Sequence, residues 1–315
     1  MIRSRLARAI IGLGAGIWMP AIASPATAAA AQDFTLEPVA PGVFVHFGRP
    51  LPLDAPGHDD IANIGFIVGS RCVAVIDTGG SVRVGRALRA ALARRTPKPV
   101  CYVINTHVHV DHVLGDLAFE DGHASFIGHG ALPAAIARNR RYFMKNYGDD
   151  MDQPPTPEQV VAPDRTVSDT LELDLGERPL RLRAWPTAHT DCDLTVLDEK
   201  TATLWTGDLL FRERLPAVDG DVGGWLGVID ELARLPAKRA IPGHGPLAAD
   251  LAAALQPERR YLRTLLEDVQ REIDGGESLQ HAIEHAAQAE KPQWLLWDST
   301  HPRNVTRVYQ QLEWK

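Results

Sequence analysis

The segment Thr106-His107-Val108-His109-Val110-Asp111-His112 places three imidazoles and one carboxylate within six residues. It directly follows Val100-Cys101-Tyr102-Val103-Ile104, an apolar run whose composition predicts a buried strand. Polar groups crowded at the end of a strand contribute little to a hydrophobic core, whereas His and Asp are common zinc ligands. The segment therefore predicts a metal site, with enough ligands to begin holding two ions.

Three further candidate ligands lie downstream, each at the end of a strand-like run. His189 follows Ala184-Trp185-Pro186-Thr187-Ala188, Asp208 follows Leu204-Trp205-Thr206-Gly207, and His244 follows Ile241-Pro242-Gly243. A site for two metal ions needs more ligands than one short segment supplies. Together with the first cluster, these residues give seven candidate ligands.

The pattern along the chain predicts two αβ halves packed face to face. In the first half, strand-like runs at 42–46, 64–68, 72–76 and 100–104 surround an amphipathic helix at 82–95. In the second half, strand-like runs occur at 171–175, 180–185, 194–197, 202–208 and 240–244. Further helices are predicted at 131–150, 226–236, 257–273 and 278–290. Because ligands in α/β proteins bind at strand ends, the site is expected at one edge of the sheets.

The N-terminus has the pattern of a secretory signal peptide. Arg3, Arg5 and Arg8 precede a short apolar stretch at 9–17, and a segment rich in alanine follows. We expect cleavage near residue 30, leaving 31–315 as one exported, periplasmic domain with a C-terminal helical segment from about 250, and no membrane span after cleavage.

The charge balance argues against a polyanionic partner. The chain carries a net charge of −7, and loss of the three N-terminal arginines would bring it to about −10. An acidic protein is a poor match for nucleic acid, which binds through clustered Lys and Arg. A small-molecule substrate is the better expectation.

The chain contains three cysteines, Cys72, Cys101 and Cys192. An odd number leaves at least one thiol unpaired within the chain. Cys72 and Cys101 fall inside strand-like runs, so we interpret them as buried thiols in preference to a disulfide, which an exported protein would nevertheless permit.

Several side chains near the candidate ligands receive other assignments. His123 and His129 occupy turn-like positions and are expected to make local hydrogen bonds. His58 lies in an early loop, where contact with substrate is the alternative to a structural role. Trp225 is assigned either to the wall of the site or to the core, and Cys192 to a place near the metals without ligating them.

The ordered set of motifs resembles the metallo-β-lactamase superfamily. The set comprises V-I-D-T-G at Asp77, T-H-x-H-x-D-H at His107, A-H-T-D-x-D at His189, T-G-D-L-L-F at Asp208 and P-G-H-G at His244. The tail at 303–314 and the segment at 59–66 are similar to a narrower group, the quinoprotein relay system zinc metallohydrolases, which are exported proteins related to sulfur-oxidation loci.

This resemblance implies a four-layer αββα sandwich and a role for each ligand. His107, His109 and His189 would bind one zinc ion, Asp111, His112 and His244 the other, and Asp208 would bridge the two. Asp77 would hold the ligand loops by hydrogen bonds without ligating. All seven residues would then be catalytic through the two zinc ions, whose shared hydroxide hydrolyses an ester, thioester, lactone or lactam.

Three alternatives stay open at this point. The first is an iron-dependent enzyme of sulfur metabolism resembling a persulfide dioxygenase, and the second is a true β-lactamase. The third is a non-catalytic metal-binding partner of a periplasmic quinoprotein dehydrogenase, an association that is also compatible with a hydrolase. The substrate itself depends on loops at about 48–62, 131–166 and 212–225.

Overall fold

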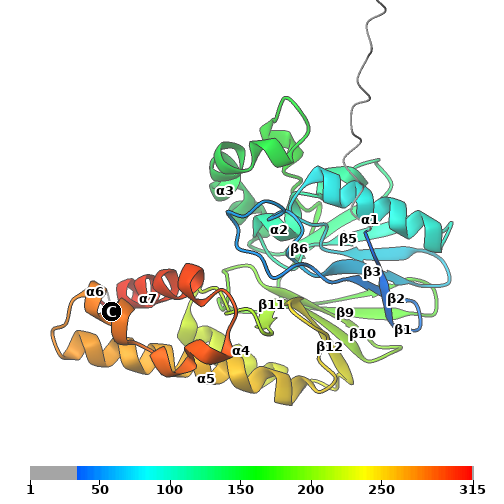
Figure 1. Cartoon of the computed structure of the whole chain (residues 1–315). Coiled ribbons are helices and arrows are strands. Elements are labelled where there is room, and N and C mark those ends of the chain that lie inside the picture. The colour runs from blue at the N-terminus through cyan, green and yellow to red at the C-terminus, as the bar shows by residue number, and fades with distance from the viewer. Residues whose placement is uncertain (1–33, 314–315) are drawn as a thin grey trace, which may run out of the picture. The chain divides into compact units, whose positions relative to one another are not determined.

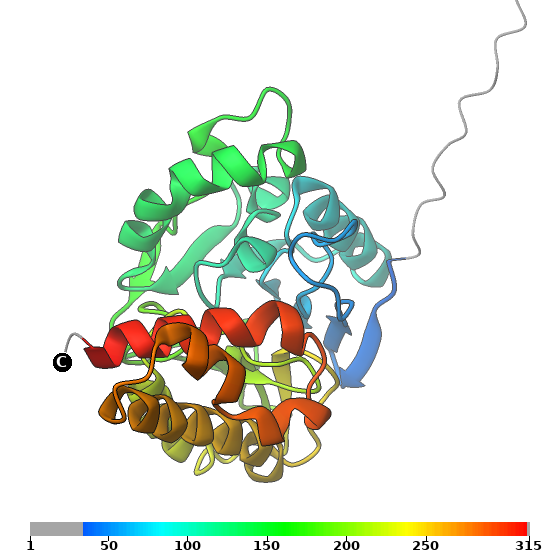
Figure 2. The same ribbon diagram turned by 60° about the vertical axis from the view of Figure 1, so that its left-hand side comes forward.

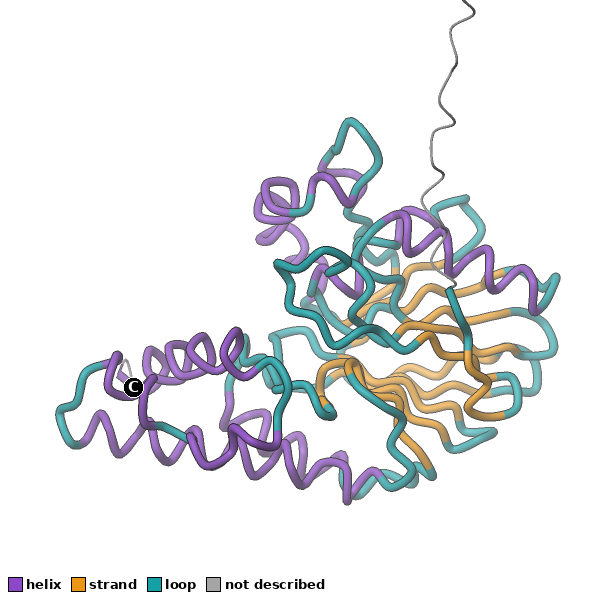
Figure 3. Tube along the Cα trace, viewed as in Figure 1, coloured by secondary structure: helices purple, strands orange, loops and turns teal. Residues whose placement is uncertain are grey.

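The computed structural model describes residues 34–313, so the predicted signal peptide at 1–30 lies outside the described residues. The described residues form two β-sheets stacked face to face, with helices on both outer faces (Figure 1 and Figure 3). This is the predicted αββα arrangement, and the fold prediction is confirmed.

The first sheet has seven strands in sequential order. Its strands are β1 (Glu37–Ala40), β2 (Val43–His46), β3 (Ile64–Val68), β4 (Val73–Ile76), β5 (Val100–Ile104), β6 (Ser125–His129) and β7 (Arg165–Val167). The pairings from β1 to β4 are antiparallel, and those from β4 to β7 are parallel. Because β4 and β5 are parallel neighbours, the loops that follow them emerge at the same edge.

The second sheet has five strands in the order β12-β11-β10-β9-β8. These are β8 (Thr170–Asp174), β9 (Pro179–Ala184), β10 (Leu194–Asp198), β11 (Thr203–Phe211) and β12 (Arg239–His244). Only β11 and β12 pair in parallel within this sheet. Their carboxyl ends therefore reach one edge together, as those of β4 and β5 do.

The helices of the described residues are α1 (Val82–Arg95), α2 (Val110–Val113), α3 (Leu132–Asn146), α4 (Val222–Leu232), α5 (Leu251–Asp274), α6 (Leu279–His285) and α7 (Trp297–Glu313). Short 3-10 turns occur at η1 (Asp116–Phe119), η2 (Gly148–Asp150), η3 (Pro157–Gln159) and η4 (Gln288–Gln293). The last three helices pack together at the C-terminal side (Figure 2). Between residues 34 and 313, no helix combines the length and apolarity needed to cross a membrane.

Two helices begin earlier than the sequence pattern predicts. Helix α4 begins at Val222 because the Asp221 carboxylate accepts a hydrogen bond from the Gly224 amide at 2.6 Å and caps the helix. Helix α5 begins at Leu251, where Asp250 caps it in the same way, and it continues through Pro257.

Alternating side chains of the strands fill separate cores. In β4, Val73 and Val75 face α1 in one cluster, whereas Ala74 and Ile76 face the second sheet in another. The outer face of the second sheet packs on α4 and α5 in a third cluster, which includes Trp225. These three cores hold the four layers together.

The structure corrects the prediction for two cysteines. Cys72 and Cys101 form a disulfide, with their Cα atoms 5.8 Å apart. Cys72 immediately precedes β4 and Cys101 lies in β5, so the parallel pairing of these strands brings the two side chains together. Cys192 is the remaining thiol, and it is buried.

A buried arginine ties the two sheets to each other. Arg178 donates to both carboxylate oxygens of Asp198, at 3.0 and 2.6 Å, and to the carbonyl of Val68 in the first sheet at 2.9 Å. The Arg178 and Asp198 side chains are almost fully buried. Each charge therefore depends on the other for compensation.

We expect Asp198→Ala to lower the free energy of unfolding by about 3–5 kcal/mol, because it leaves the Arg178 guanidinium buried without a partner. Urea denaturation followed by circular dichroism measures this loss. The matched control is Asp152→Ala, which removes an equally bidentate but exposed pair with Arg86 and should cost no more than about 1 kcal/mol. Equal losses in the two variants would contradict this assignment.

Candidate metal centre

The seven predicted ligands meet at one edge of the sandwich. His107 and His109 follow β5, and Asp111 and His112 lie in α2. The other three are His189 in the loop between β9 and β10, Asp208 within β11, and His244 at the end of β12. Both sheets thus contribute ligands.

Four of these side chains form a first group. Ligand atoms of His107, His109, His189 and Asp208 all lie within 4.8 Å of one another. The His189 Nε2 atom is 3.0 Å from His109 Nδ1 and 3.3 Å from Asp208 Oδ2. This spacing fits a single ion held between three imidazoles and a carboxylate.

Asp111, His112 and His244 form a second group, again with ligand atoms within 4.8 Å of one another. The Nε2 atom of His244 is 3.3 Å from Asp111 Oδ2 and 3.4 Å from Asp208 Oδ2. The Nε2 atom of His112 is 3.2 Å from Asp208 Oδ1. Asp208 therefore lies between the groups, at the position predicted for a bridging ligand.

Several atoms of this cluster are buried without a hydrogen-bond partner. They are His107 Nε2, His112 Nε2 and Asp208 Oδ1. An unsatisfied buried polar atom costs about 1–3 kcal/mol, more when charged. Divalent cations would satisfy all three atoms at once, so the residues present fit a metal centre.

The protonation states of two histidines also suit metal binding. Burial lowers the pKa of His107 well below its usual value and that of His189 to about 3. Both imidazoles are consequently neutral near pH 7, which is the form that coordinates a metal. Burial alone would raise the pKa of Asp208, but the surrounding histidines, led by His244 and His112, hold it well below the usual range.

The outward-facing ring nitrogens of three candidate ligands are fixed by hydrogen bonds. The Nδ1 atom of His112 lies 2.7 Å from Asp77 Oδ2, that of His189 2.8 Å from the Ala217 carbonyl, and that of His244 2.8 Å from the Ile61 carbonyl. Each contact directs the opposite nitrogen, Nε2, into the centre.

Asp77 makes the contacts expected of it. Its carboxylate accepts hydrogen bonds from the Thr106 amide and hydroxyl, both at 2.8 Å, besides contacting His112. Its backbone has a positive φ of 52°, a strained conformation for a residue with a side chain. The carboxylate thus joins the end of β4 to the ligand-bearing loop after β5.

Gly243 makes room for the central carboxylate. A Cβ atom at this position would lie 1.8 Å from Asp208 Oδ1. Only glycine permits this approach between β12 and β11, which explains the residue that precedes His244.

The other side chains singled out in the sequence have mostly structural contacts. His58 Nε2 lies 2.9 Å from Asp150 Oδ2, and His129 Nδ1 accepts from the Ala131 amide at 2.9 Å. Trp225 is fully buried against the ring of His189, so it backs that ligand from the core. Cys192 is buried and is not grouped with the candidate ligands.

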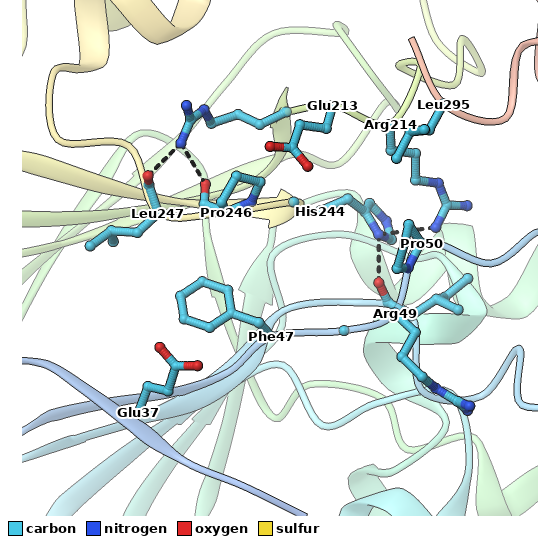
Figure 4. A pocket seen from close by; sticks show the side chains of 14 residues that line it. Glu37, Phe47, Arg49, Pro50, Glu213, Arg214, His244, Pro246, Leu247 and Leu295 are labelled. Atoms are coloured by element: carbon cyan, nitrogen blue, oxygen red, sulfur yellow. Dashed lines mark hydrogen bonds between the residues drawn. The ribbon is translucent and has the colours of Figure 1, made fainter.

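The sequence analysis missed Asp219, whose Oδ2 atom lies 3.2 Å from His109 Nε2. It also missed a pocket of about 480 Å³ beside His244. Arg49 and Arg214 line this pocket together with Phe47 (Figure 4). Arg212 is a further lining residue. The Asp-Gly pair at 219–220 is a weak sequence indication that Asp219 lies near the candidate ligands. The run Arg212-Glu213-Arg214 is a similarly weak indication of the pocket.

An αββα sandwich with clustered His and Asp at one edge defines a hydrolase fold with a candidate metal site. The family model described as "Metallo-beta-lactamase superfamily" matches residues 58–244, a span that includes all seven candidate ligands, and the chain belongs to this superfamily. No curated protein matches the sequence.

Solved structures show the same fold at low sequence identity. A sec-alkylsulfatase from Pseudomonas sp. aligns with a TM-score of 0.66 and 18% identity over 88% of this chain and 50% of that one, so this chain spans about half of that protein's length. A metallo-beta-lactamase family protein from Thermus thermophilus aligns with a TM-score of 0.63 and 22% identity, over 87% and 93% of the two chains. A metallo-beta-lactamase from Pontibacter korlensis aligns with a TM-score of 0.60 and 19% identity, over 73% of this chain and 98% of that one.

We expect Asp77→Asn to weaken zinc binding about 10- to 100-fold, because it removes the negative charge that orients His112. Competition with a chromophoric chelator measures the affinity. Glu272→Gln is the matched control, since Glu272 contacts His281 at 2.6 Å far from the candidate ligands and should leave zinc affinity unchanged. Wild-type affinity in the Asp77 variant would contradict the orienting role.

Proposed function

We propose that this protein is a hydrolase that holds two zinc ions and cleaves an ester, thioester, lactone or lactam bond. The observation that carries the proposal is the Asp208 carboxylate, whose two oxygens face histidines of both ligand groups. A carboxylate in this position is suited to two cations and is poorly explained by a purely structural role.

Each group of side chains would hold one ion. His107, His109 and His189 would bind the first, Asp111, His112 and His244 the second, and Asp208 both. Zinc bound there would supply a water of lowered pKa and would polarise the oxygen of the bond to be cleaved.

Asp111 adds an acceptor at the reacting centre. Burial opposes its ionised form, but the facing His112 and His244 outweigh this effect and hold its pKa below the usual range. The ionised carboxylate can orient a water molecule and accept a proton from it. Buried apolar neighbours on the same side, including Val108 and Val110, keep bulk water away.

We further propose that the protein acts in the periplasm after export, where it associates with a quinoprotein dehydrogenase. The arginine-rich N-terminus with its short apolar stretch supports export. The similarity of residues 59–66 and of the tail to the quinoprotein relay group supports the association. Recovery of such a dehydrogenase with the protein from periplasmic extracts is the corresponding observation.

Metal analysis coupled to a hydrolysis panel tests the main proposal. We expect about two zinc ions per chain, turnover of at least one substrate class, and loss of turnover on chelation with recovery on adding zinc. Because the similar structures include a sulfatase and a β-lactamase, the panel should contain sulfate esters and lactams besides carboxylic esters, thioesters and lactones.

Two variants sharpen this test. Asp208→Ala should lower kcat/KM by roughly 100-fold or more and reduce the zinc content, because both ions lose a ligand. Asp230→Ala changes an exposed aspartate of α4 that pairs with Arg259, outside the three loops expected to set the substrate, and should behave as wild type. Iron without zinc in the native protein would favour the iron-dependent alternative, and a two-zinc protein inert on the whole panel would contradict a hydrolase.

A further inference from the structure

We propose that the pocket beside His244 binds an oxyanion group of the substrate and that Arg214 selects it. This inference rests on the proposed function, because it assigns a substrate class to the same centre. The pocket holds about 480 Å³, enough for a small acidic group and its linker. His244 forms part of its wall, so an occupant can lie next to the metal centre (Figure 4).

Arg214 is buried yet has no acceptor that suits it. Its side chain belongs to a residue only 8% exposed, and within residues 34–313 it forms no ion pair with a carboxylate. Its one hydrogen-bond-length contact joins Nη1 to His244 Nδ1 at 3.1 Å. The carboxylates whose charge offsets that of Arg214 are Asp111 and Asp208, both candidate metal ligands. Metal ions held by these two carboxylates would leave the guanidinium without an anion of its own.

The contact with His244 cannot serve as a good hydrogen bond in the metal-loaded protein. If His244 ligates through Nε2, then Nδ1 carries the hydrogen and donates to the Ile61 carbonyl at 2.8 Å. Two hydrogen-bond donors, His244 Nδ1 and Arg214 Nη1, then face each other. The Arg214 guanidinium is thereby left available for an anion from outside the chain.

The other two arginines of the pocket donate to backbone carbonyls and, within residues 34–313, make no hydrogen bond with a candidate ligand, although the Nε atom of Arg49 is buried without a hydrogen-bond partner. Arg212 donates through Nη1 to the carbonyls of Pro246, at 2.9 Å, and Leu247. Arg49 donates to the Gly57 carbonyl at 2.9 Å and lies 3.7 Å from Asp60. Glu37 and Glu213 also line the pocket, but neither pairs with Arg214. Arg214 is therefore the arginine best placed to recognise a ligand.

The backbone fixes Arg214 in this position. Glu213 has a positive φ of 64°, an unfavourable conformation for a residue other than glycine. Hydrogen bonds with Leu295 hold the strained segment on both sides, since the Leu295 amide donates to the Glu213 carbonyl at 2.7 Å and the Leu215 amide to the Leu295 carbonyl at 3.0 Å. Strained backbone conformations of this kind cluster at functional sites, where they fix the direction of a neighbouring side chain.

The chemistry of Arg214 defines the substrate class. A planar guanidinium matches a carboxylate, sulfate or phosphate through paired, charge-assisted hydrogen bonds. The substrate would carry such a group apart from the bond that reacts, with one end at the metals and the other in the pocket.

Binding of dicarboxylates tests this inference without requiring turnover. Succinate, glutarate and adipate are compared by calorimetry with the monocarboxylates propionate, butyrate and valerate on the two-zinc protein. At least one dicarboxylate should bind about 10- to 100-fold more tightly than its monocarboxylate counterpart. Arg214→Met should abolish this advantage, and Arg214→Lys should retain part of it.

Arg212→Met is the charge-matched control, because it removes one positive charge from the same pocket and leaves the contact between Arg214 and His244 in place. It should keep the wild-type advantage. No advantage for any dicarboxylate in wild type, or an undiminished advantage in Arg214→Met, would overturn the inference. Zinc content is measured for every variant, so failure to bind zinc counts against the proposed function and not against this pocket.

A different observation concerns the C-terminal helix α7. We infer that Asn304 positions the ligand His189 through the loop that carries Ala217. The Asn304 side chain accepts from the Val218 amide at 2.9 Å and donates to the Pro216 carbonyl at 2.7 Å. It thereby holds both residues that flank Ala217, whose carbonyl accepts from His189 Nδ1.

Asn304 is itself held by buried partners. Its Nδ2 atom also donates to the Tyr261 hydroxyl at 2.9 Å, and that hydroxyl lies 3.1 Å from His301 Nδ1. All three side chains are essentially inaccessible to solvent. The hydrogen bond to Tyr261 joins Asn304 of α7 to α5, and loss of either group would leave the other buried with one partner fewer.

Selective loss of one metal ion tests this positioning role. Asn304→Ala should weaken the ion held with His189 about 10- to 100-fold and leave the ion held by Asp111, His112 and His244 at wild-type affinity. Stepwise chelator competition gives the two affinities, and cobalt substitution reports which coordination sphere changes through its visible absorption.

Val305→Ala is the matched control, because Val305 is the next residue of α7, is fully buried and has no side-chain group that could hydrogen-bond to the loop. It should lower thermal stability without changing the ratio of the two affinities. Equal weakening of both ions by Asn304→Ala, no weakening, or the same selectivity in Val305→Ala would overturn the inference. A wild-type protein that binds only one ion would instead contradict the proposed function.

Discussion

A single carboxylate buried among histidines constrains this molecule more than any other group. Asp208 is 4% exposed, and its oxygens lie within 3.4 Å of the Nε2 atoms of His112, His189 and His244. Such a charge is tolerated only if positive charge or metal surrounds it. The constraint reaches the neighbouring strand, where only glycine fits at position 243 because of Asp208.

Much of the fold could be predicted from the sequence because its elements have clear local patterns. Helix α1 has the predicted bounds, and β4 and β5 lie where apolar runs end in polar turns. The starts of α4 and α5 were misplaced, since Gly223 and Pro257 hid helices whose true beginnings depend on the caps Asp221 and Asp250. The disulfide was missed because strand register, which no local pattern encodes, brings Cys72 to Cys101.

The candidate site also contains residues that could be predicted from the sequence and others that could not. The seven candidate ligands could be singled out because each is a His or Asp at or near the end of a strand-like run, and the structure brings their side chains together. The groups that orient them could not, since the Ile61 and Ala217 carbonyls belong to no particular residue type. Arg214 escaped notice because its burial and its contact with His244 depend on tertiary packing, which the sequence does not display.

The C-terminal helical segment supplies contacts that support both the candidate metal centre and the pocket. The superfamily match ends at residue 244, yet Asn304 holds the loop behind His189 and Leu295 holds the strained turn that aims Arg214. A change in this segment would therefore alter how a ligand is oriented, or what the pocket accepts, without touching any candidate ligand. Residues beyond β12 thus support both the candidate metal centre and the pocket without contributing a candidate ligand.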